Sequence, residues 1–366
     1  MTETEIITAF SDFLANSKTA KPSGHVDIQA DGERHRYHVE GDRAKTKNGC
    51  YCLYTDGLPA GWCMSWKNGK EEKEIWKYEL TDDEKKAYAQ EKNDPVLKAQ
   101  TEKDRLERER RKTEALKLQR EKQEQARQKA ETEYNNSKPF CHETGLIENP
   151  YWRKKFETLH GMYIDYLRLN LSSNAFPIAI VRTPIEGGFC ERGAILVPMV
   201  NLVTGKFQSL IKIAGKPDSD GSYAKKNYPD TSLTAAGHWI ITPDSAQSQI
   251  ILVSEGITTA IAVAMMNHQR GRRDAVLSAG PCGNLKSACE ALRERYPDRK
   301  IIIMADNDKL NQGKNAGLDT AVKCVALGLA DDKRVPDKAP TGQGRDWYDH
   351  CFNEYKLLEE RIEANG

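Results

Sequence analysis

The chain has 366 residues, of which 38% are hydrophobic and 30% charged, and its formal net charge is +1. This length is enough for two or three domains with their own cores. No apolar run approaches the roughly 20 residues of a membrane-spanning helix, and the acidic N-terminus lacks the basic start of a signal peptide. We therefore expect a cytoplasmic protein that makes no membrane contact.

Residues 1–80 are predicted to form a small α+β domain. Apolar residues at helical spacing predict an amphipathic helix over residues 1–17. Short alternating runs follow, separated by Asp-Gly and Asn-Gly pairs that are typical of tight turns. The runs predict an antiparallel sheet with strands at residues 25–28, 35–39, 50–54, 62–66 and 74–78.

Residues 81–138 differ in composition, because Lys, Arg, Glu and Gln dominate them. Helix propensity and Glu–Lys and Glu–Arg pairs favour a helix. Leu106, Leu116 and Leu118 form no sustained heptad pattern, so a strong coiled coil is not expected. We interpret the segment as a charged helical linker that is solvated along its length.

The rest of the chain is predicted to be globular, with a first part at residues 139–247 and a second at 248–366. The first part has a helical pattern at residues 151–171, a Gly-, Lys- and Asp-rich loop at 215–229, and strands at 179–181, 194–200 and 207–213. In the second part, apolar strands alternate with helices, which predicts a parallel sheet covered on both faces. Its strands are expected at 250–253, 275–277 and 300–304, and its helices at 258–267, 285–296 and 315–327.

Acidic residues follow two of these parallel strands. Glu255 comes directly after the first strand, and Asp306 and Asp308 follow the third. Ligands of parallel α/β sheets bind beyond the carboxyl ends of the strands, so the three carboxylates are expected to meet at one rim. Oxygen ligands of this kind suit Mg²⁺ or Mn²⁺. The alternative is structural: Glu255 caps the next helix and the two aspartates begin a loop.

The same residues carry a resemblance to a known family. Glu255-Gly256 after one strand and Asp306-Asn307-Asp308 after a later one resemble the Toprim signature of bacterial primases, topoisomerases and related nucleases. With Lys314-Asn315-Ala316-Gly317 downstream, the pattern is most similar to the primase branch. The resemblance implies an α/β Toprim-containing primase core, joined by the charged linker to the α+β N-terminal domain.

Further segments extend the resemblance over nearly the whole chain. Residues 344–349, Gly-Arg-Asp-Trp-Tyr-Asp, are similar to a Gly-x-Asp-(Trp/Phe)-Asn-Asp segment of phage and plasmid primases, with Tyr348 where Asn is usual. Asp346 or Asp349 would then add a carboxylate to the metal site, whereas their alternative role is a helix N-cap. Upstream, the similar segments are Asn149-Pro150-Tyr151, Leu196-Val197-Pro198-Met199, Gln208-Ser209-Leu210 and His38-Val39-Glu40-Gly41-Asp42.

The function that the resemblance implies is that of a DNA primase of the phage or plasmid type. Such an enzyme joins nucleoside triphosphates into short primers on single-stranded DNA by metal-dependent nucleotidyl transfer. Glu255 would bind metal or act as base, and Asp306 and Asp308 would hold the ions. The alternatives are a Toprim-type nuclease and a non-catalytic DNA-binding accessory of replication or defence. The sequence contains no Gly-x-x-x-x-Gly-Lys-(Ser/Thr) loop, so a replicative helicase would be a partner on a separate chain.

The cysteines do not predict a zinc site. Cys50, Cys52 and Cys63 lack the usual zinc-ligand spacing, and Cys141 adjoins His142 directly. Nine cysteines without a disulfide-like pattern are typical of reduced thiols in a cytosolic protein.

Basic and aromatic residues are candidates for nucleic-acid contacts. The core residues that would touch template phosphate or incoming triphosphate are Lys212, Lys225, Lys226, Lys314 and Arg345. Their alternative role is that of ordinary solvated residues. The N-terminal residues that predict a single-strand surface are Arg43, Lys45, Lys47, Tyr37, Tyr51, Trp62 and Trp66. The alternative is that these aromatic residues form the core of the sheet and that the domain docks a partner protein.

Overall fold

A computed structural model describes residues 2–43, 45–55, 58–66, 73–81, 95–139, 149–156, 174–307, 315–336 and 346–351. The chain divides into two compact units, Met1–Leu116 and Lys117–Gly366. Each unit contains its own β-sheet, so the fold is mixed α and β. Among the described helices, none has the length and apolar character that a membrane span requires.

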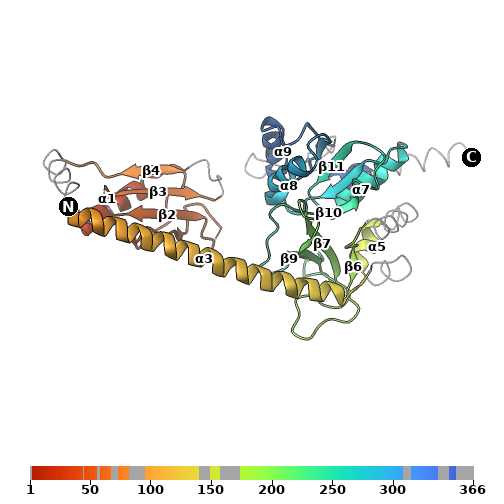
Figure 1. The fold of residues 1–366 in the computed structure, drawn as a ribbon, viewed down its shortest axis with the longest axis horizontal. Helices are drawn as coiled ribbons and strands as arrows, with labels where there is room; N and C mark the ends of the chain where they lie inside the picture. The colour runs from red at the N-terminus through yellow and green to blue at the C-terminus, as the bar shows by residue number, and fades with distance from the viewer. Residues whose placement is uncertain are drawn as a thin grey trace, which may run out of the picture. The chain divides into compact units, whose positions relative to one another are not determined.

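In the first unit, one helix packs on one face of a four-stranded antiparallel sheet (Figure 1). The elements are α1 (Glu3–Ala15), β1 (His35–Tyr37), β2 (Gly49–Tyr54), β3 (Ala60–Ser65) and β4 (Glu74–Lys77). A capping box between Thr2 and Glu5 begins α1. The apolar stripe of this helix packs against Tyr51 and Leu53, which are 1% and 0% exposed.

One expected strand of this unit is absent. Residues 25–28 form no regular strand. Their neighbourhood is held by the Tyr51 hydroxyl, which donates to the Asp27 carbonyl at 3.2 Å and accepts from the Gln29 N–H at 2.9 Å. A side chain therefore supplies the hydrogen bonds that a neighbouring strand would otherwise make.

A single helix of 41 residues, α3 (Pro95–Asn135), spans the boundary between the units. Its middle is exposed, as expected, and carries ion pairs such as Arg111–Glu107 and Arg110–Glu114. Its last turns are different, because Ala126, Ala130 and Glu133 are buried in the second unit. The expectation of a helix solvated along its whole length is wrong there.

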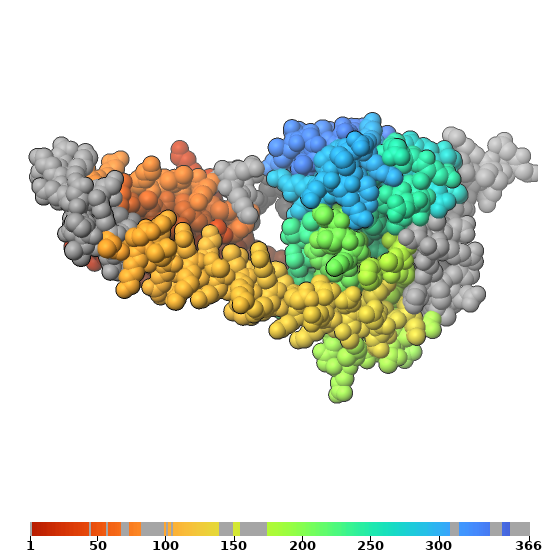
Figure 2. Space-filling model, in the orientation of Figure 1, coloured from red at the N-terminus to blue at the C-terminus, as the bar shows by residue number. Residues whose placement is uncertain are grey.

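The second unit has a mixed sheet in the order β14-β13-β11-β12-β10-β7-β6-β5, with β8 paired to β7 and β9 to β8. The strands are β5 (Lys138–Pro139), β6 (Ala179–Ile180), β7 (Ile195–Asn201), β8 (Phe207–Ile213), β9 (Lys225–Asn227), β10 (Ala236–Ile241), β11 (Ile250–Ser254), β12 (Ala275–Ser278), β13 (Lys300–Met304) and β14 (Asp332–Arg334). Strand β10 pairs antiparallel with both β12 and β7, so it joins the parallel and antiparallel halves. Figure 2 shows the green antiparallel segments directly against the blue and teal parallel half.

The parallel half is wound on both faces, as predicted. Helix α7 (Ile257–Gln269) packs on one face with Leu252, Val276 and Ile302. Helices α8 (Cys282–Arg295) and α9 (Ala316–Ala326) pack on the other face with the alternate strand residues. Strand β12 follows β11 on one side of it, and the chain then crosses to β13 on the other side of β11. The direction in which strands are added to the sheet therefore reverses between β11 and β13. Ligand sites in such sheets lie at this reversal.

Four strands were not predicted, namely β5, β9, β10 and β14. Strand β9 is Lys-Lys-Asn and entirely exposed, so it has no apolar pattern. Strand β10 contains Gly237, where a side chain would collide with Leu277, and the fully buried His238. The His238 Nδ1–H donates to the Pro198 carbonyl at 2.8 Å, and burial lowers the pKa of His238 to about 4.

Helix α5 (Pro150–Phe156) is the described part of the helix expected at residues 151–171. Asn149 begins it and is fully buried. The Asn149 side chain accepts from the Trp152 N–H at 3.3 Å and donates to the Gly193 carbonyl at 2.8 Å. The Asn-Pro-Tyr segment thus ties the helix to the loop before β7.

Candidate active site

A cavity of about 400 Å³ opens at the carboxyl ends of β11, β12 and β13. Glu255, Asp306 and Asp346 contribute to its lining. The antiparallel half of the sheet also contributes to the lining, including Lys225 and Asn227 of β9. The cavity is therefore lined both by acidic residues that follow the parallel strands and by polar residues of β9.

The strand register explains why Glu255 and Asp306 share this cavity. Ser254 of β11 lies opposite Met304 of β13, so Glu255 comes one residue after that pair and Asp306 two. The backbone of Glu255 is fixed, because its carbonyl accepts from the Ser278 hydroxyl at 2.9 Å and from the Gly280 N–H at 2.8 Å. The end of β12 therefore holds Glu255 in place.

The start of α9 contacts both acidic residues. Asn315 caps this helix by accepting from the Leu318 N–H at 3.1 Å, and its side-chain amide donates to the Asp306 carbonyl at 3.4 Å. Gly317 lies against the Glu255 carboxylate, and a methyl group at position 317 would overlap Glu255 Oε1. The Asn-Ala-Gly segment thus supports the backbone of one acidic residue and leaves room for the carboxylate of the other.

Asp346 reaches the cavity because its neighbour is anchored. The buried Trp347 ring donates from Nε1 to the Ala305 carbonyl at 3.1 Å, directly before Asp306. Asp346 Oδ1 accepts from the Asp349 N–H at 2.7 Å, so Asp346 also has the contact of a helix N-cap. Asp349 is exposed and is not part of the cavity lining.

The chemistry of the lining suits a hard divalent cation. Mg²⁺ is commonly held by one or two carboxylates plus substrate phosphates and water, and Glu255 and Asp306 are donors of this kind. Gly317 leaves the space that the Glu255 carboxylate occupies. Asp308 lies outside the described residues. Among the residues that the structure does describe, no group of three or more His, Cys, Asp or Glu lies close enough to hold a metal ion.

The first turn of α7 also borders the cavity. Thr258 and Thr259 belong to the lining, and the N-cap Gly256 makes no side-chain capping hydrogen bond. The N–H groups and the positive end of a helix dipole favour an anion at such a terminus. The Glu-Gly-Ile-Thr-Thr sequence signals this feature, because its glycine supplies no capping side chain. Thr258, Thr259 and Asn227 were not among the site residues expected from the sequence.

The basic candidates fall in different places. Lys225 lines the cavity, with its ammonium 5.6 Å from the Tyr151 ring centre. Lys226 is exposed and is not part of the lining. Lys212 does not line the cavity either, because its ammonium donates to the Phe189 carbonyl at 2.6 Å and to Glu191 at 2.8 Å. Lys314 and Arg345 lie outside the described residues.

The ion pair of Lys212 has an electrostatic consequence for its partner. Burial acts to raise the pKa of Glu191, but hydrogen bonds from the Lys212 ammonium and the Gly215 N–H outweigh it. The pKa of Glu191 is therefore lowered, and the carboxylate stays ionised beside the lysine. This arrangement gives Lys212 a structural role.

No protein-family model matches the chain. Two curated relatives, both named DNA primase TraC and both from Escherichia coli, are 28% identical over 302 residues and 25% identical over 299 residues. The alignments cover 81% and 80% of this chain but only 23% and 17% of the relatives. The chain thus spans less than a quarter of the length of the relatives it matches. Over most of its own length, it is a distant relative of proteins named DNA primase.

Proposed function

We propose that the chain is a Toprim-type primase of the phage or plasmid kind. It would synthesise short primers on single-stranded DNA by metal-dependent nucleotidyl transfer. The observation that carries the proposal is the shared cavity of Glu255 and Asp306, at the reversal between β11 and β13. The similarity to proteins named DNA primase supports the choice of reaction.

In the proposed reaction, the 3′-hydroxyl of one nucleotide attacks the α-phosphate of the next, and pyrophosphate leaves. A bound Mg²⁺ or Mn²⁺ would lower the cost of negative charge on the phosphates. Glu255 and Asp306 would hold it, together with Asp308, and Glu255 is also the candidate to accept the proton of the hydroxyl. The first turn of α7 and the Lys225 ammonium, which both line the cavity, would bind phosphate oxygens.

Two alternatives use the same fold differently. A Toprim nuclease would direct water at a phosphodiester with the same carboxylates, and an accessory protein would bind DNA without chemistry. The antiparallel half of the sheet favours the primase, because its Lys225 and Asn227 line the same cavity as the carboxylates. A replicative helicase on a separate chain is the proposed protein partner.

Incubation with labelled nucleoside triphosphates, single-stranded DNA and Mg²⁺ or Mn²⁺ tests the proposal. A primase makes short labelled oligomers, and Asp306→Asn and Glu255→Gln abolish them without loss of fold. Shortened DNA without labelled product would show the nuclease instead. DNA binding with neither product would leave the accessory role.

A further inference from the structure

The sheet of the first unit has a second face that α1 does not cover. Strand register places Arg36, Cys50 and Met64 in one row across this face, and Cys52, Trp62 and Ile75 in the next. The alternate residues of the same strands pack toward α1. The residues that we call the aromatic–basic face are Arg34, Arg36, Tyr54, Trp62, Trp66, Lys73 and Lys77.

Two of the three aromatic rings of this face are exposed, and the third, Trp62, is half-buried. Trp66 is 39% exposed and Tyr54 is 37% exposed. The sheet does not need these rings for its core, because Phe10, Tyr51 and Trp76 pack together on the other side. Large exposed rings on a small domain indicate a binding surface when they cluster.

Cations lie over the same rings. The Arg36 guanidinium is 5.6 Å from the Trp66 ring centre. On Trp62, the Arg34 guanidinium lies 5.8 Å and the Lys73 ammonium 3.9 Å from the ring centre. These distances are those of cation–π contacts, and Arg34, Arg36 and Lys73 are themselves exposed. A ring and a positive charge are thus presented side by side to solvent.

The face carries positive charge without nearby opposition from its own strands. Among the described residues of β1 to β4, the one carboxylate is Glu74, which belongs to the opposite face. There Glu74 accepts from the Ser17 and Thr19 hydroxyls at 2.8 and 2.6 Å. The charge of the face therefore favours an anionic partner.

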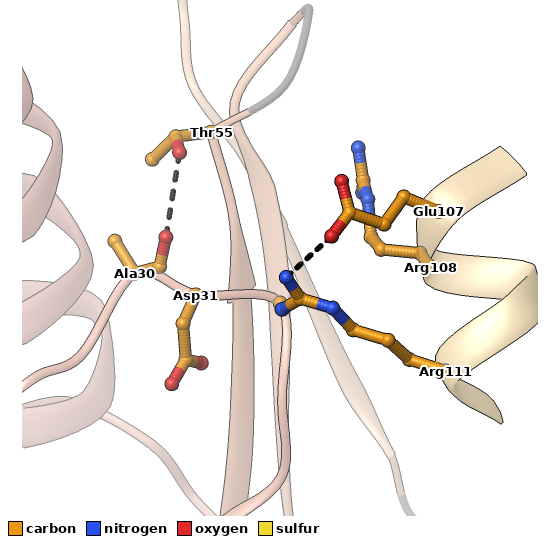
Figure 3. Close-up of a pocket in the computed structure, with 7 residues that line it drawn as sticks. Ala30, Asp31, Thr55, Glu107, Arg108 and Arg111 are labelled. Carbon is orange, nitrogen blue, oxygen red and sulfur yellow. Dashed lines mark hydrogen bonds and ion pairs between the residues drawn. The ribbon is translucent and has the colours of Figure 1, made fainter. Parts of the chain in front are cut away.

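A charged cavity with both basic and acidic residues borders the Tyr54 end of the face. Gly32 lies against the Tyr54 ring and lines a cavity of about 300 Å³ with Thr55, which follows β2. From α3, Arg108 and Arg111 line the same cavity, and Figure 3 shows Arg111 directed toward it while bonded to Glu107 at 2.6 Å. Asp31 and Glu107 line the cavity as well, so its two guanidiniums are balanced by two carboxylates and the net positive charge stays on the aromatic–basic face itself.

We propose that the aromatic–basic face binds single-stranded nucleic acid. Bases stack on Trp62 and Trp66, and phosphates pair with Arg34, Arg36 and Lys73. A base displaces the exposed Lys73 ammonium from the Trp62 ring, and the ammonium turns to a phosphate. Stacking of this kind requires unpaired bases, because bases in a duplex already stack on one another. The surface uses none of the carboxylates of the second unit, so it is independent of the proposed reaction.

The test is fluorescence anisotropy of a labelled oligothymidine of about 15 nucleotides, a length near the upper end of known single-strand site sizes. The full chain is titrated in EDTA without nucleotides. Trp62→Leu and Trp66→Leu keep apolar bulk but remove the aromatic face, and each is expected to weaken binding about tenfold, in line with the stacking contribution of one base. Trp62→Phe and Trp66→Phe should recover part of the loss. The double variant Arg34→Ala/Arg36→Ala should flatten the log–log salt dependence by about 1.4, or about 0.7 for each phosphate contact.

Lys18→Ala is the matched charge control, because Lys18 is exposed beside Glu74 on the α1 side. It should leave the affinity unchanged, and circular dichroism confirms that each variant folds. If Trp62→Leu destabilises the sheet, the affinity of Trp66→Leu alone tests whether the face binds single-stranded DNA. Two outcomes would overturn the proposal and leave protein docking as the use of this face. One is that the folded tryptophan variants bind the oligonucleotide as tightly as the unmodified chain, and the other is that the unmodified chain binds no single-stranded DNA. Because no metal or nucleotide is present, failure here leaves the proposed reaction untouched.

Discussion

At the scale of single residues, Gly317 has no reactive group, yet it determines the space available to the Glu255 carboxylate in the candidate active site. A methyl group at position 317 would overlap Glu255 Oε1, and the Glu255 backbone is already held by Ser278 and Gly280. Gly317→Ala therefore forces the carboxylate to rotate away. We expect primer synthesis to fall about 100-fold, since a misplacement of about 1 Å can cost that much.

A matched control exists in α8. Gly283, like Gly317, is the second residue of its helix, and a methyl group there meets nothing within 4 Å. Gly283→Ala should gain up to about 1 kcal/mol of stability, which is the usual preference of helices for alanine, and should keep full activity. Assays of both variants, with thermal unfolding, check the prediction. Equal activities would show that Glu255 does not depend on the space at Gly317.

At the scale of elements, the last turns of α3 belong to the fold of the second unit. Glu133 is 8% exposed and accepts from the N–H groups of Phe189 and Cys190, both at 2.9 Å, and from the Tyr228 hydroxyl at 2.7 Å. Glu133→Gln replaces one acceptor oxygen by an NH₂ group that faces donors. We expect it to destabilise the second unit by about 1–3 kcal/mol at neutral pH.

The pH dependence of this difference follows from the pKa of Glu133. Burial acts to raise the pKa, but the hydrogen bonds from Phe189, Tyr228 and Cys190 outweigh it, so the folded-state pKa lies below the ordinary value of 4.5. The stabilisation is therefore complete above that value and is lost as the pH falls through the folded-state pKa. Denaturant unfolding should show the two proteins converging in acid. A constant difference at all pH values would contradict the role of ionised Glu133.

The elements that sequence analysis predicted are those with a strong pattern. The strands β11, β12 and β13 are apolar and alternate with helices, so their parallel arrangement was predictable. Strand β9 was not predictable, because its residues are polar and it forms only by pairing with β8. The burial of Glu133 was hidden for a similar reason, since its partners lie 56, 57 and 95 residues away in the chain.

At the scale of the whole molecule, it was predictable from strand order alone that Glu255 and Asp306 line the same cavity. The outcome for the basic residues was not predictable, because Lys212 lies in β8 and Lys225 in the neighbouring β9, and the register of this pair sets where each side chain points. Lys212 turns to Glu191 and Lys225 to the cavity. The aromatic residues of the first unit also differ in their burial, since Tyr37 and Tyr51 are buried while Trp66 is exposed. Composition identifies such residues as candidates, and the register decides which face they occupy.

Limited proteolysis tests how the two units share α3. The side chains of residues 109–122 are exposed throughout or nearly so, whereas Ala126, Ala130 and Glu133 are buried in the second unit. Local opening is easiest where few apolar contacts form, so we expect the first cuts at basic residues between positions 109 and 122. The stable C-terminal product should therefore begin before Ala126, well upstream of Pro139, and N-terminal sequencing of the product identifies its start.

A stable product beginning at or after Pro139 would show that the Glu133 contacts do not hold the helix end. Glu133→Gln is the internal comparison, because weakening the anchor should move the cuts toward Asn135.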